Sequence, residues 1–201
     1  MAGPKFISGT AVSSSSGTDV MLIAGQSAAG NAVPLAVNST GGLVSGSAGF
    51  TASASFTPAA TAYGAADVMS VAQAFAFLDA AGNAIPSASL ICITAAITKI
   101  DVTAVPSGQT SYTLYCYSVT PPSAQADNAA WTLASADLPS YLGSIALGTP
   151  ADLGAALYIR ASAPNLYAQL AGTSLFGVLV TDGAHTAAAV ARQIRLHCTV
   201  I

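Results

Sequence analysis

The chain has 201 residues, a length typical of one domain with an appendage. Only 6% of its residues are charged, whereas an average soluble domain carries about 25%. The formal net charge is −3 and only five residues are basic, too few to neutralise a run of phosphates, so we expect no nucleic-acid partner.

The remaining composition favours strands and turns. Apolar residues make up 53% of the chain, many of them alanine, and glutamate is absent. The polar residues are mainly serine, threonine, glycine and asparagine, which disfavour long helices. These polar residues also interrupt the uncharged stretch between Asp19 and Asp67, so we expect no membrane-spanning helix. The start, MAGPKFISGTAV, lacks the apolar core of a secretory signal, which favours assembly inside the cell.

Residues 1–48 predict an extended arm. Glycine, serine and alanine dominate, with short strand-like pieces at 19–24 and 33–37. Such a segment has too few large side chains to close a core, so we expect another molecule to order it. The apolar side chains expected to make these contacts are Phe6, Ile7, Val20, Leu22, Val33, Leu35, Val37, Leu43 and Val44.

Residues 49–201 predict an antiparallel β domain. From Phe50 to Thr57, apolar and polar residues alternate, the pattern of a half-buried strand. Further strands are expected at 68–78, 90–102, 111–119, 142–147, 157–161, 166–170, 174–181 and 190–201. Strands in this number predict an all-β sandwich, specifically a jelly roll.

Two of these segments carry the clearest patterns. In the last strand, Ile194, Leu196 and Cys198 share one face, so this strand is expected to pack on the core. Residues 175–180 are almost continuously apolar, which predicts a central strand covered on both faces. The odd set of three cysteines does not outline a disulfide framework, and each cysteine is expected to act as a small buried hydrophobe.

The connection between Thr120 and Tyr141 is long for a compact domain. Two interpretations stay open. The loop is a contact loop, in which Trp131 and Tyr141 touch a partner, or Trp131 plugs one end of the sandwich.

No motif in the chain indicates catalysis. Gly-x-Ser-x-Gly is missing, and neither lysine follows a glycine-rich phosphate loop. A metal site at 182–185 is disfavoured, because Asp182 is better explained by a turn and His185 by a solvated loop. Arg195 is expected on the solvent or subunit face, and Arg192 in a pair with an aspartate. We therefore expect no enzyme, no cofactor and no metal.

Three stretches resemble the structural proteins of tailed-bacteriophage virions. They are SVTPPSAQADNAAW from Ser118 with the following YLG, GTPADLGAALYI from Gly148, and LAGTSLFGVLV from Leu170. The arm sequence GNAVPLAVNSTGGLV, from Gly30, is similar to the leaders of such proteins.

This resemblance implies a subunit on the capsid surface, assembled in the host cytoplasm and anchored on the shell by its arm. The implied partners are the major capsid protein and further copies of the chain, as trimers in preference to dimers. The expected function is a decoration, or cement, protein that stabilises the capsid by binding its exterior. The alternative is a fibre or spike head that binds a host receptor or a glycan.

Overall fold

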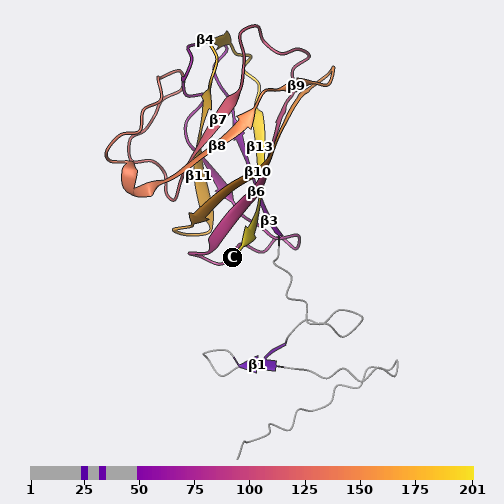
Figure 1. Ribbon diagram of the computed structural model, residues 1–201, viewed down its shortest axis with the longest axis vertical. Coiled ribbons are helices and arrows are strands. Elements are labelled where there is room, and N and C mark those ends of the chain that lie inside the picture. Colours follow the sequence, from indigo (N-terminus) through magenta and orange to yellow (C-terminus); the bar gives the residue numbers. More distant parts are fainter. Residues whose placement is uncertain (1–23, 27–31, 35–48) are drawn as a thin grey trace, which may run out of the picture. The chain divides into compact units, whose positions relative to one another are not determined.

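The computed structural model describes residues 24–26, 32–34 and 49–201 (Figure 1). The chain divides into two compact units, Met1–Gly46 and Ser47–Ile201. In the first unit, β1 (Ala24–Gln26) and β2 (Ala32–Pro34) pair antiparallel. They overlap the strands expected at 19–24 and 33–37, whose other residues lie outside the described ones.

The second unit contains a five-stranded sheet in the order β3-β13-β6-β10-β9. All its pairs are antiparallel. At one end of this sheet, Gly49 of β3 lies opposite Thr199 of β13. The strands are β3 (Gly49–Phe56), β6 (Leu90–Ile100), β9 (Ala151–Asp152), β10 (Leu157–Gln169) and β13 (Arg192–Val200).

A four-stranded sheet has the order β5-β11-β7-β8 and is also antiparallel. Its strands are β5 (Gln73–Ala76), β7 (Tyr112–Tyr117), β8 (Tyr141–Gly148) and β11 (Ser174–Thr181). A third pair joins β4 (Ala62–Tyr63) to β12 (His185–Thr186), and Leu138–Ser140 form a single 3-10 turn. The described residues contain no α-helix, so the expected all-β, antiparallel class is confirmed. No helix long and apolar enough to cross a membrane occurs among them.

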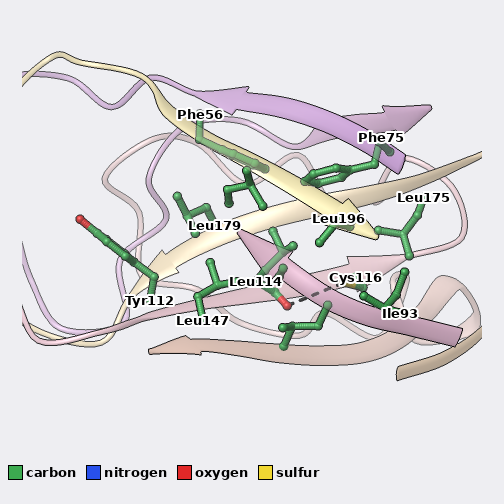
Figure 2. Close-up of a cluster of buried hydrophobic side chains, with 14 of the residues drawn as sticks. Phe56, Phe75, Ile93, Tyr112, Leu114, Cys116, Leu147, Leu175, Leu179 and Leu196 are labelled. Carbon is green, nitrogen blue, oxygen red and sulfur yellow. Dashed lines mark hydrogen bonds between the residues drawn. The ribbon is translucent and has the colours of Figure 1, made fainter. Parts of the chain in front are cut away.

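The two sheets share one hydrophobic core. Strand geometry sends alternate side chains to opposite faces of a sheet, and the apolar set of each sheet lies in the same cluster. Phe56 and Leu196 enter this cluster from the five-stranded sheet, and Leu114 and Leu179 enter it from the four-stranded sheet (Figure 2). Each of these four side chains is fully buried.

The two clearest sequence patterns are confirmed. Ile194, Leu196 and Cys198 are buried on the core face of β13. Strand β11 lies between β5 and β7, and its residues 177–181 are all buried. Gly177 is required there, since a Cβ atom would lie 2.8 Å from both Leu114 Cδ1 and Phe75 Cε2.

Two expected strand boundaries were wrong. The segment 68–78 is not one strand, because Ser70 has a φ of 91°, which interrupts the extended backbone before β5. The segments 157–161 and 166–170 instead belong to one strand, β10, with an irregularity between Ser162 and Leu166. Ala163 and Asn165 have positive φ angles at that irregularity.

The three cysteines are free and buried, as expected of small hydrophobes. The thiol of Cys116 lies 3.7 Å from the carbonyl oxygen of Leu114, to which it donates (Figure 2). Burial raises the pKa of both Cys116 and Cys198 to about 12. At neutral pH these two side chains are therefore protonated thiols, which are poor nucleophiles.

We predict that Cys116 and Cys198 resist alkylation by iodoacetamide in the native protein at pH 8. Both should react fully in urea, because unfolding restores the ordinary thiol pKa. Mass spectrometry of tryptic peptides measures this difference. Rapid native labelling of Cys116 would contradict the buried position of that residue.

Candidate contact surfaces

The outer faces of the two sheets differ in how they are covered. On the four-stranded sheet, Tyr117, Val178 and Val180 point away from the shared core but are almost fully buried. They pack with Val68 and with Trp131 of the loop between β7 and β8. This loop, residues 118–140, therefore covers the outer face of its own sheet.

Two aspartates hold the covering loop in place. The Asp127 carboxylate accepts hydrogen bonds from Tyr63 Oη at 2.7 Å, from the Ser70 N–H at 2.7 Å and from the Ala59 N–H at 2.9 Å. The Asp137 carboxylate is fully buried and accepts from the Ser123 N–H at 2.9 Å and from the Ser123 hydroxyl. The loop is thus bound to the segment before β5 as well as to itself.

Trp131 and Tyr141, the two loop residues expected to contact a partner, lie close together. The Trp131 ring stacks on Tyr115 with 3.6 Å between centroids, and Tyr141 lies 5.5 Å from Tyr117. Both side chains are half-buried. Trp131 covers the outer face of the four-stranded sheet. A partner would contact the part of the Trp131 and Tyr141 side chains that stays accessible.

The expected arm contacts lie outside the described residues, apart from the backbone of Val33 in β2. Phe6, Ile7, Val20, Leu22, Leu35, Val37, Leu43 and Val44 therefore stay predictions.

One end of the five-stranded sheet exposes large apolar side chains, and we call it the apolar end. The exposed fractions are 42% for Leu78, 45% for Leu90, 64% for Tyr167 and 62% for Ile201. Leu78 exchanges two backbone hydrogen bonds with Thr51 near the start of β3, and the Ile201 N–H donates to Leu90 at the start of β6. Tyr167 pairs with Cys92, two residues from Leu90. Leu90, Tyr167 and Ile201 thus lie on neighbouring strands, whereas Leu78 lies at the far edge of the sheet, beyond β13 and β3. Sequence reasoning missed this surface, because its members come from four separate segments.

The outer face of the five-stranded sheet carries the exposed Lys and Arg side chains of residues 49–201, and we call it the basic face. Arg195 of β13 and Arg160 of β10 both lie opposite Ile97 of β6, one on each side. Lys99, two residues along β6, projects from the same face. All three cationic side chains are exposed, as expected for Arg195.

The fourth basic residue of the described domain, Arg192, is only 1% exposed. Its expected pairing with an aspartate was wrong, because its guanidinium donates to the carbonyl oxygens of Ala188 at 2.7 Å and Val190 at 2.6 Å. Arg192 lies on the inner face of β13 with Ile194, where no described aspartate forms an ion pair with it. Backbone carbonyls accept from Nη1 of the buried guanidinium instead, while its Nε has no partner.

The expectation that His185 is a solvated loop residue was also wrong. His185 lies in β12 and is 5% exposed. Its Nδ1 lies 3.1 Å from the carbonyl oxygen of Gly183 and 3.3 Å from Thr181 Oγ1, so the tautomer decides whether Nδ1 donates to the carbonyl or accepts from the hydroxyl. The ring stacks on Tyr63 with 6.2 Å between centroids. Burial lowers the pKa of His185, and the nearby charge of Arg192 lowers it further, against the opposite effect of the Gly183 hydrogen bond.

No group of three or more His, Cys, Asp or Glu side chains within residues 24–26, 32–34 and 49–201 is arranged to hold a metal ion. The aspartates described above accept hydrogen bonds from neighbouring backbone and hydroxyl groups. The described residues offer surfaces for contact, a shallow hollow on the basic face, and a second hollow that shares Lys99 and Gln193 with the first and is also lined by Asp101. No protein-family model, curated protein or solved structure matches the chain.

We predict that Asp127→Ala loosens the covering loop. The substitution removes the acceptor used by Ser70, Ala59 and Tyr63, and an unsatisfied polar group costs about 1–3 kcal/mol. Hydrogen exchange of residues 120–135 should accelerate, with a lower free energy of unfolding. Asp152→Ala is the matched control, because Asp152 is exposed and accepts only from nearby Gly154.

We also predict that the domain loses stability on mild acidification. His185 has a lowered pKa in the folded state, so the unfolded chain takes up a proton at this residue more readily. The free energy of unfolding should fall as the pH drops below about 6.5, the ordinary histidine value, until the lower folded pKa is reached. His185→Gln should flatten this dependence in urea titrations at pH 7, 6 and 5. An unchanged slope in this variant would assign the effect to other groups.

Proposed function

We propose that the chain is a virion structural protein of a tailed bacteriophage, a decoration subunit that binds the exterior of the capsid and stabilises it. The observation that carries this proposal is the apolar end, where Leu90, Tyr167 and Ile201 are exposed on neighbouring strands. Exposed apolar clusters mark contact sites on otherwise soluble domains. The major capsid protein is the proposed partner, and such a subunit acts by binding only the assembled shell.

We propose further that the domain is a jelly-roll sandwich. Its main strands in chain order are β3, β5, β6, β7, β8, β10, β11 and β13. The first, eighth, third and sixth of these are neighbours in one sheet, and the second, seventh, fourth and fifth are neighbours in the other. This order is that of two interlocked Greek keys, and the shared core between the sheets supports the same assignment. Jelly rolls are frequent in viral capsid proteins.

The low charge of the chain supports a structural role over an enzymatic one. With 6% charged residues, few side chains are available for acid–base chemistry or for keeping a bare surface hydrated. A surface of small polar and apolar groups suits contact with many neighbouring subunits. Self-association, with trimers favoured over dimers, belongs to the same proposal.

The proposal is tested by binding the purified chain to phage particles that lack it. We predict that the double variant Leu90→Ser with Ile201→Ser loses most of its affinity, because about 25 cal/mol of stabilisation is lost per Å2 of apolar contact. Leu153→Ser is the matched control. Leu153 is 68% exposed, but it follows β9, which pairs with the other end of β10. Co-sedimentation measures binding, and equal losses in both variants would remove the apolar end from the proposal.

Deleting residues 1–44 should abolish particle binding and leave the domain folded, because residues 49–201 have their own core. Circular dichroism checks the fold, and co-sedimentation checks the binding. Undiminished binding would remove the arm from the proposal.

Counting copies separates the decoration subunit from the fibre or spike head. Quantitative mass spectrometry of purified particles should find hundreds of copies of a decoration subunit, as expected for sites repeated by shell symmetry. A few copies at the tail would instead indicate a receptor-binding protein.

A further inference from the structure

We propose that the basic face binds a carbohydrate that carries carboxylate groups, in a hollow between β3, β13 and β6. This inference uses the outer face of the five-stranded sheet and not the apolar end. It therefore does not depend on the particle-binding proposal, and either can fail alone.

Charge is segregated within the domain. Residues 49–201 contain four Lys or Arg residues and seven Asp residues. All four cations lie in β6, β10 and β13, whereas the five-stranded sheet contains one aspartate, Asp152 of the edge strand β9, and Asp101 directly follows β6. Because Arg192 is buried, the outer face presents Lys99, Arg160 and Arg195. In a chain this poor in charge, three exposed cations on one face favour an anionic ligand.

The spacing of these cations supports the same conclusion. Arg195 and Arg160 flank Ile97 on the two neighbouring strands, so their Cα atoms are roughly 10 Å apart. Lys99 occupies the next row of the same face, between Gln193 and Tyr158. These like charges repel one another, and a bound anion relieves that repulsion.

The face is hollowed beside Lys99 and Arg195. The hollow has a volume of about 300 Å3, at the lower end of the range for small-ligand pockets. Arg195 Nε donates to Ser53 Oγ at 3.3 Å, which orients the guanidinium at this position. Two hydroxyls, one amide, two cations and an apolar floor thus converge on one place. The side chains that supply these groups to the hollow are Ser53, Ser55, Ile97, Lys99, Gln193 and Arg195.

These groups match an acidic sugar better than other anionic partners. Serine hydroxyls and the Gln193 amide complement sugar hydroxyls, and the cations complement a carboxylate. Protein interfaces are depleted in serine and lysine, which line this hollow. Three cations are too few to follow a nucleic-acid backbone.

The test uses isothermal titration calorimetry of the full chain with galacturonate oligosaccharides. Galactose oligosaccharides are the neutral match, and poly-L-glutamate supplies carboxylates without sugars. We expect saturable galacturonate binding that weakens with added salt, and neutral-sugar binding at least about tenfold weaker. Absence of galacturonate binding would overturn the proposal. Equal binding of poly-L-glutamate would also overturn it, because any carboxylate polymer would then suffice.

Three matched substitutions locate the site. Lys99→Gln and Arg195→Gln should each weaken galacturonate binding about tenfold, the loss expected for one charge-assisted hydrogen bond. Arg160→Gln removes the same charge from the same face but outside the hollow, and it should cost less than about threefold. Equal losses in all three variants would indicate diffuse attraction and overturn the site. Thermal melting confirms that each variant is folded.

Discussion

The domain depends on one constraint, which is that the two sheets must bury their apolar faces against each other. Each sheet turns an apolar face toward the other, and residues such as Phe56, Leu114, Leu179 and Leu196 meet between the two sheets. Backbone hydrogen bonds join the strands within each sheet, and a pair between Thr51 of β3 and Leu78, just after β5, links the two sheets at one edge. Across the rest of the interface side-chain packing holds the sheets together, and Gly177 shows how close that packing is.

The outer faces of the two sheets differ in whether the chain covers them. The four-stranded sheet is apolar on both sides, so its outer side needs a cover, and the loop with Trp131 and Asp127 provides one from within the chain. The five-stranded sheet is polar outside, with Ser53, Lys99 and Arg195 in the positions that alternate with core residues. It needs no cover and stays open to a ligand. The long loop thus serves stability, while the open face and the apolar end are free for contacts.

Much of the fold was predictable because period-two alternation reports burial directly. It located β3 and β13 closely, and the almost continuous apolar run at 175–180 identified β11 as an inner strand. It failed at Ser70, where a single positive φ angle interrupts the strand without any change in hydropathy. The contact surfaces were not predictable in the same way. Ile97, Arg160 and Arg195 become neighbours only through cross-strand register, which a single sequence does not reveal. Arg192 and His185 were misjudged because polar residues are usually solvated, and their partners are backbone carbonyls.

The pairing of Gly49 with Thr199 places the beginning and the end of the domain side by side on adjacent strands. A short linker would therefore suffice to connect the two ends, and new termini opened in an exposed turn such as 80–83 would give a circularly permuted domain with the same strand neighbours. Because the two ends are adjacent, a protein fused to the C-terminus would project from the end of the domain where β3 starts. The opposite end, with β4 and β12, would stay unobstructed.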